Sequence, residues 1–70
     1  MPGHGFEVVV NGERQILAAA TLETALQELG FGASKVATAL NGDFVPATKR
    51  AATSLKTGDR IEVVTARQGG

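Results

Sequence analysis

The chain has 70 residues, seven of them basic and seven acidic, with 43% hydrophobic residues, one histidine and no cysteine. A chain of this length forms a single small domain, which leaves little room for an elaborate active site. The balanced charge disfavours nucleic-acid binding, which usually requires a basic stripe, and the lack of cysteine excludes disulfides and thiolate chemistry within these residues.

The first part of the chain predicts a β-hairpin. Residues 1–5 include two glycines and one proline, so we expect a flexible end. Residues 6–10 form a β-rich run that closes at Asn11-Gly12, a pair typical of tight hairpin turns. Residues 15–18 supply the return strand.

The register of this hairpin depends on the length of its loop. A two-residue loop would place Val8 opposite Gln15, whereas a three-residue loop would place Val8 opposite Ile16. Because a shift of one residue moves every side chain to the other face, only the longer loop puts the apolar side chains together. We therefore predict the three-residue loop, with Gly12 at positive φ.

A short helix is expected next. Thr21 can cap its N-terminus, Gly30 is a natural stop at its C-terminus, and Phe31 is expected to fold back on the core. Between the two ends, apolar residues recur at the spacing of one helix face: Leu22, Ala25, Leu26 and Leu29.

A second hairpin follows the helix. Residues 36–40 predict a strand, and Asn41-Gly42 predicts a two-residue turn. This turn pairs Leu40 with Asp43, Ala39 with Phe44 and Thr38 with Val45. Pro46 ends the short return strand and marks it as an edge, because proline cannot donate to a further strand.

The last third of the chain contains the longest predicted strand. Residues 47–55 have no clean period, and we expect a helical turn within them. Residues 57–59 form a turn, residues 60–66 a strand, and residues 67–70 a flexible tail. This order indicates one α+β domain over the whole chain, in which one main helix covers one face of a sheet.

The expected core consists of the inward side chains of the sheet and the apolar face of the helix. In the last strand Thr65 continues the inward row. The strands contribute Phe6, Val8, Val10, Val36, Thr38, Leu40, Val45, Ile61 and Val63, and the helix contributes Leu22, Leu26 and Leu29.

Four segments carry a pattern that is distinctive in combination. They are Val10 to Gly12, residues 39–46 (ALNGDFVP), residues 55–64 (LKTGDRIEVV) and the final Gly69-Gly70. Together they resemble the ThiS family of sulfur carriers, from about Phe6 to Gly70. The resemblance implies a ubiquitin-like β-grasp fold, with a mixed sheet of four to five strands and the last strand in the centre. The stretch after Pro46 lacks the bulky residue that is common in the family.

The resemblance also implies a function centred on Gly70. In the family, a ThiF-type adenylyltransferase uses ATP and magnesium to adenylate the C-terminal carboxylate, and sulfur then replaces AMP. A sulfur donor such as a cysteine desulfurase supplies the sulfur, and thiazole synthase of the ThiG type takes it for the thiazole ring of thiamine. The chain would then be a carrier and not an enzyme, with no catalytic residue and no bound cofactor.

The residues at the end of the chain fit this chemistry. Gly69 and Gly70 have no Cβ, so their backbone can thread through a narrow channel that would exclude side chains. Because the chain has no cysteine, it cannot carry sulfur as a persulfide, and the terminal acyl group is the position left.

The face of the sheet away from the helix predicts a partner-docking face. In the β-grasp order, small and large apolar side chains would lie together on this face, beside the tail. They are Ala37, Ala39, Phe44, Val64 and Ala66, with Arg60, Glu62 and Arg67 at the rim. Exposed apolar patches often mark partner sites, so we expect the activating enzyme to dock here. Ordinary scatter of surface alanines is the alternative.

The remaining polar residues suggest no further chemistry. His4 has no second ligand at a useful spacing, so we predict no metal site, and Asp43 and Asp59 are expected to stabilise their own turns. No charged leader precedes an apolar run and no stretch reaches membrane-spanning length, so we expect a cytoplasmic protein that does not bind membranes.

Three other functions stay open. A molybdopterin-type sulfur carrier or a ubiquitin-like modifier would use the same terminal chemistry with another acceptor. A β-grasp binding module, in contrast, would need no free terminus.

Overall fold

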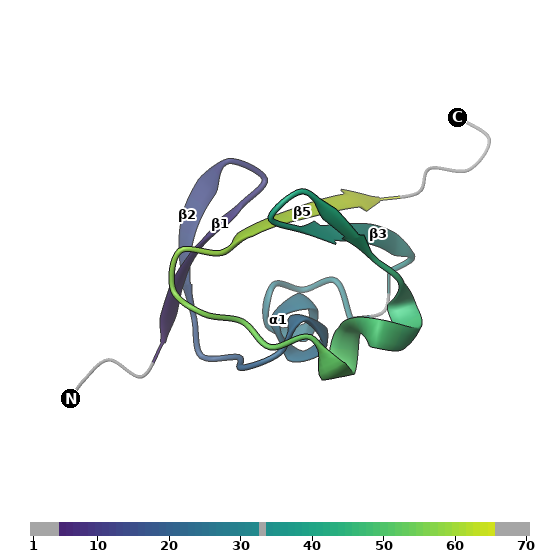
Figure 1. Ribbon diagram of the computed structural model, residues 1–70, viewed down its shortest axis with the longest axis horizontal. Helices are drawn as coiled ribbons and strands as arrows, with labels where there is room; N and C mark the ends of the chain where they lie inside the picture. Colours follow the sequence, from purple (N-terminus) through teal and green to yellow (C-terminus); the bar gives the residue numbers. More distant parts are fainter. Residues whose placement is uncertain (1–4, 33, 66–70) are drawn as a thin grey trace.

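The computed structural model describes residues 5–32 and 34–65 (Figure 1). One five-stranded sheet has the order β2-β1-β5-β3-β4, with α1 on one face. β1 and β5 are parallel and the other neighbours are antiparallel, so the sheet is mixed. The elements are β1 (Phe6–Val10), β2 (Glu13–Leu17), α1 (Leu22–Glu28), β3 (Val36–Leu40), β4 (Asp43–Val45), the 3-10 helix η1 (Ala47–Ala52) and β5 (Arg60–Thr65). The α+β prediction and the central last strand are confirmed.

The predicted register of the first hairpin is wrong. Val8 lies opposite Gln15, and Phe6 lies opposite Leu17, as a two-residue loop requires. Asn11 and Gly12 both have positive φ, 50° and 86°, which is the conformation of a type I′ turn. The turn therefore sets the register, and it buries Leu17 while it leaves Ile16 75% exposed on the outer face. The prediction of positive φ at Gly12 is confirmed.

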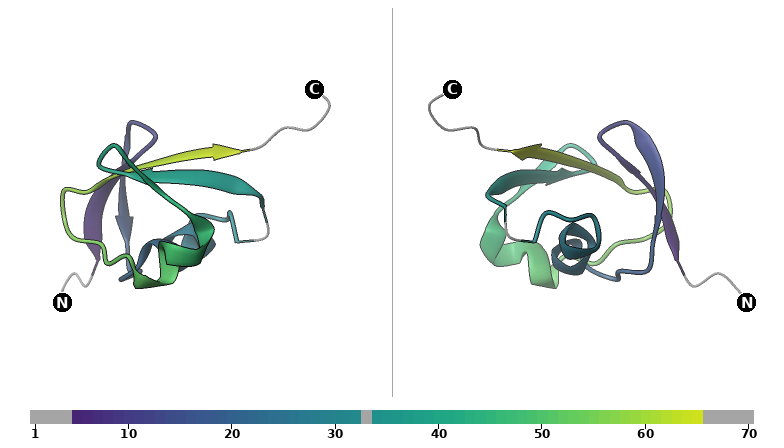
Figure 2. Two further views of the ribbon diagram at one scale, coloured as in Figure 1. Left: turned by 45° about the vertical axis from the view of Figure 1, so that its right-hand side comes forward. Right: turned by 180° about the vertical axis from the view of Figure 1, so that it is seen from behind.

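The second hairpin has the predicted register. Leu40, Ala39 and Thr38 pair with Asp43, Phe44 and Val45. η1 follows directly after Pro46, which confirms the predicted end of β4 and the helical turn. Figure 2 shows η1 on the same side of the sheet as α1.

The helix begins and ends where the sequence predicts. Thr21 is its N-cap and forms a capping box with Thr24, since each hydroxyl accepts from the other residue's backbone N–H. At the other end Gly30 has a φ of 95°, and the Phe31 backbone N–H donates to the Leu26 carbonyl at 2.7 Å. This turn brings Phe31 back against the core.

The core lies between the sheet and α1. Ten apolar residues are buried in it: Val8, Val10, Leu17, Leu22, Ala25, Leu26, Val45, Leu55, Ile61 and Val63. The predicted Phe6, Leu29, Val36 and Leu40 pack against it and are partly buried, and Thr38 is buried. Leu17, Ala25 and Leu55 are outside the predicted core set, and the prediction that Thr65 points inward is wrong, because it is exposed at the end of β5. No helix in the described part of the chain is long and apolar enough to cross a membrane.

Candidate functional site

Strand pairing brings the predicted docking residues together on the outer face of the sheet. Ala37 lies opposite Val64 across β3 and β5, and Ala39 lies opposite Phe44 across β3 and β4. Phe44 is 69% exposed and Val64 is 66% exposed, and exposed apolar side chains that lie together often mark a partner site. We call these four residues the outer patch. The predicted Ala66 and Arg67 lie outside the described residues, as do Gly69 and Gly70.

A shallow groove of about 350 Å³ adjoins the outer patch. It lies where the first hairpin diverges from β5, and it is lined by Val9, Gly12, Arg60, Ile61 and Glu62. Glu62 lies opposite Ala39, so the groove and the patch are continuous across β5. The predicted rim residues Arg60 and Glu62 therefore line a groove of mixed polarity beside an apolar surface, an arrangement suited to docking another protein.

Side chains from both hairpin turns hold β5 in place. The Asn11 side-chain amide donates to the Val63 carbonyl at 3.1 Å, and the Val63 backbone N–H donates to Asn11 Oδ1 at 2.8 Å. On the other flank, the Arg60 backbone N–H donates to Asn41 Oδ1 at 2.9 Å. β5 is thus fixed between two asparagines, and its direction toward the C-terminal residues is set by the fold.

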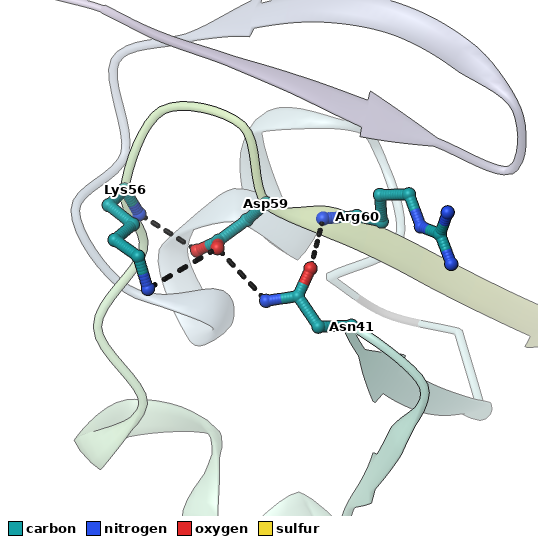
Figure 3. A network of polar contacts seen from close by, with 4 residues as sticks. All are labelled: Asn41, Lys56, Asp59 and Arg60. Carbon is teal, nitrogen blue, oxygen red and sulfur yellow. Dashed lines mark hydrogen bonds and ion pairs between the residues drawn. The ribbon is translucent and has the colours of Figure 1, made fainter.

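Asp59 lies at the centre of a polar network at the start of β5 (Figure 3). Its carboxylate accepts from Asn41 Nδ2 at 3.0 Å and from the Lys56 backbone N–H at 2.8 Å, and the Lys56 ammonium lies 3.8 Å away. Burial raises the pKa of the Asp59 carboxyl, but the hydrogen bonds from Asn41 and Lys56 and the charge of Lys56 outweigh burial and hold this pKa below its ordinary value. The predicted turn role of Asp59 therefore extends to a residue 18 positions away.

Arg50 closes the edge of β3 beyond the end of β4. The Thr38 and Leu40 backbones pair with β4, but β4 ends at Val45, so no strand residue lies beside Val36 on that side. Arg50 Nη2 donates to the Val36 carbonyl at 2.7 Å, and Arg50 Nε donates to Thr38 Oγ1 at 3.2 Å. Arg50 thus takes the place of a further β4 residue.

Three residues of the site were not predicted in these roles: Asn11, Asn41 and Arg50. The Asn-Gly turn signals reveal the positions of the two asparagines but not their long-range partners. Arg50 falls in a segment without a period, and nothing in the sequence pattern indicates its contact with β3. Asp43, also predicted to stabilise its turn, is exposed next to the second turn, and His4 lies outside the described residues.

Comparison with known families and proteins gives consistent results. The model of the ThiS family matches residues 8–70 of this chain. A thiazole synthase from Paramagnetospirillum magneticum is 38% identical over 65 residues, which are 91% of this chain and 20% of that protein. The chain therefore spans about a fifth of the length of this relative.

One solved structure has the same fold. The crystal structure of the thiamine biosynthesis protein ThiS from Geobacter metallireducens matches with a TM-score of 0.75 and 28% sequence identity. The match covers 93% of this chain and 100% of that chain. This likeness, with the strand order described above, confirms the predicted β-grasp fold.

Proposed function

Because the chain belongs to the ThiS family, we propose that it is a sulfur carrier of thiamine biosynthesis, with Gly70 as the residue that carries the sulfur. A ThiF-type enzyme adenylates the Gly70 carboxylate with ATP and magnesium and releases pyrophosphate. A persulfide sulfur from a donor such as a cysteine desulfurase then displaces AMP, and a thiol reductant cleaves the resulting disulfide. The product is a thiocarboxylate. The chain is the substrate of these steps and does not catalyse them.

The chemistry explains why activation comes first. A carboxylate is a poor acyl donor because its oxygen is a poor leaving group, and adenylation provides a good one. Magnesium neutralises phosphate charge during that transfer. Gly69 and Gly70 allow the backbone to reach a nucleotide inside the partner, because they carry no Cβ. Each residue that becomes fixed on docking costs about 1–2 kcal/mol of conformational entropy, which contacts of the folded body must offset.

The observation that best supports this proposal is the central position of β5, the strand that leads in the sequence to Gly69-Gly70. β5 pairs with β3 over five residues and is held on its other flank by β1 and Asn11. One residue of the outer patch, Val64, lies in the last half of the same strand, where it pairs with Ala37 of the neighbouring β3. We propose that the activating enzyme docks on the outer patch, so that the terminus enters its active site from a fixed direction.

Thiazole synthase is the proposed acceptor of the sulfur. The similarity to a thiazole synthase favours this branch over a molybdopterin-type carrier, which would have the same terminal chemistry. The match lies within a protein about five times longer than the matched region, so the synthase activity of that relative is not proposed for this chain.

Intact-mass spectrometry tests the proposal directly. The chain is incubated with a ThiF-type enzyme, ATP, magnesium and a sulfur source, and we expect a gain of about 16 Da, one oxygen replaced by sulfur. Fragmentation should locate the gain at Gly70. A chain without Gly70, or with one residue added after it, is the control and should gain no mass. No gain by the unaltered chain with a demonstrably active enzyme would refute the proposal.

A further inference from the structure

Three basic residues belong to the segments at the end of the sheet where β5 stops. Lys35 directly precedes Val36, and Val36 lies opposite Thr65, the last described residue of β5. Arg50 reaches the same place from η1, because its Nη2 donates to the Val36 carbonyl. Lys49, the residue before Arg50, is exposed on η1. We call Lys35, Lys49 and Arg50 the tail-end cluster; Figure 1 shows η1 below this end of β3 and β5.

No ion pair in the described part of the chain involves a cation of the tail-end cluster. Residues 34–36, 46–54 and 63–65 at this end contain three of the seven basic residues and none of the seven acidic ones, while α1, which packs against η1, adds Glu23 and Glu28. The two ion pairs in the described ranges, Arg14–Glu7 and Lys56–Asp59, involve none of the three cations. Their charges are therefore available to another molecule.

The opposite end of β5 has mixed charge. There the two hairpin turns are followed by Glu13 and Asp43, and the basic residues Arg14 and Arg60 lie among them. The chain as a whole has no net charge. A protein that has no net charge but has a basic end is attracted to an acidic surface mainly through that end. The attraction rotates the protein, so that the end of β5 approaches the acidic surface first.

We infer that the tail-end cluster docks on an acidic protein surface around the opening through which the activating enzyme receives the C-terminal residues. This inference rests on the proposed function. The cluster would add an orienting charge contact to the apolar contact of the outer patch. Contacts of this kind mainly raise the association rate and make it depend on salt.

An acidic protein surface fits the cluster better than nucleic acid. The chain has three aromatic residues, all phenylalanine, and none lies in the segments that form this end, so bases would have no stacking platform. Arg50 is half-buried and already donates twice within the fold, which holds this cation in a fixed position, whereas Lys35 and Lys49 are exposed. The charge of Arg50 has a fixed position near the end of β5, which suits contact with a partner surface of fixed shape.

The experiment compares two double variants with the same change in net charge. Lys35→Gln/Lys49→Gln removes the two exposed cations of the cluster and leaves Arg50 in place. Arg14→Gln/Lys56→Gln removes two cations elsewhere on the chain. Association with the ThiF-type enzyme is measured by surface plasmon resonance from low to physiological salt, and circular dichroism confirms that both variants are folded. We expect the first variant to associate about fivefold more slowly at low salt with a shallower salt dependence, and the control to change less than twofold.

Two results would overturn the inference. Equal association rates for the two double variants would show that only net charge matters. Unchanged association with slower turnover at saturating carrier would assign the lysines to the nucleotide phosphates instead of a docking surface. The mass gain of the unaltered chain is measured in parallel. A chain that binds the enzyme but gains no mass would refute the proposed function. The inference about the tail-end cluster is tested by the association rates alone.

Discussion

The carboxamide of Asn11 pairs with the backbone of Val63 as a residue of a neighbouring strand would. It donates to the Val63 carbonyl at 3.1 Å and accepts from the Val63 N–H at 2.8 Å, across 52 positions of sequence. β1 pairs with β5 only at Val9 and Val10, so this side chain extends the contact between them by one further pair. A turn residue thereby stabilises the strand that leads to the terminus proposed to carry the sulfur.

Replacement of Asn11 should separate its two roles. Asn11→Gly keeps a residue that tolerates the φ of 50° but removes the carboxamide, whereas Asn11→Ala removes both. We expect Asn11→Gly to lose about 1–2 kcal/mol of unfolding free energy and Asn11→Ala to lose more. Urea denaturation measures both. Equal stability of Asn11→Gly and the unaltered chain would show that the hydrogen bonds to Val63 contribute nothing.

The first hairpin can be tested through its two apolar neighbours. Leu17 is buried and Ile16 is 75% exposed, so Leu17→Ala should cost about 2–4 kcal/mol and Ile16→Ala less than about 1 kcal/mol. Thermal and urea denaturation of the two variants measure the difference. The reverse ranking would support the three-residue loop.

Asp59 should make the stability depend on pH in the acid range. Its pKa is lower in the folded chain than the ordinary value of about 3.9, so the folded state releases its proton more readily than the unfolded state. The contribution to stability is therefore complete above about pH 3.9 and is lost as the pH falls through the lower, folded value. Asp59→Asn should be less stable than the unaltered chain at pH 7 by about 1–3 kcal/mol, and the two should converge in acid. Parallel unfolding curves from pH 7 to pH 2 measure this, and a constant difference would contradict it.

Arg50 should matter for stability while its neighbour does not. Arg50→Met leaves the Val36 carbonyl and the Thr38 hydroxyl without the guanidinium, and we expect a loss of about 1–3 kcal/mol. Lys49→Met is the matched control, because Lys49 is exposed on the same short helix and should change stability by less than about 0.5 kcal/mol. Similar losses for both variants would assign the effect to the charge of η1.

The outer patch should affect activation and not folding. Phe44→Asp and Val64→Asp place a charge in the proposed contact with the activating enzyme, and each should lower kcat/KM for adenylation by about tenfold. Ile16→Asp is the control, because Ile16 is equally exposed on the same face but lies on the far edge strand. Unfolding curves confirm that all three variants are folded. Unchanged adenylation by Phe44→Asp and Val64→Asp would remove the patch from the interface.

Local patterns in the sequence predicted most of the elements and most of the core. The helix followed from the spacing of Leu22, Ala25, Leu26 and Leu29, and the second hairpin followed from one Asn-Gly pair. The same rule would have given the first hairpin correctly. Burial of Ile16 would require a longer loop than the Asn-Gly signal indicates, but β2 is an edge strand that can expose an apolar residue.

Contacts between distant segments could not be predicted in this way. The Leu55 N–H donates to the Ala20 carbonyl at 2.9 Å, which ties an irregular segment to the start of α1 and buries Leu55. No period marks that segment, so its core residue had no signal. The pairs Asn11–Val63 and Asn41–Asp59 likewise depend on the strand order, which the sequence suggested only through resemblance to a family.

The central position of β5 also has a consequence for the order in which the chain folds. Each hairpin can form from residues that are close in sequence, but β2-β1 and β3-β4 have no strand pairing with each other except through β5. Formation of local hairpins is rapid, whereas the insertion of a strand between two distant segments requires the closure of long loops. The sheet therefore becomes one structure only when residues 60–65 are in place. A carrier that has not finished folding would lack both the joined outer face and the fixed strand, so an activating enzyme that requires both would select completed molecules.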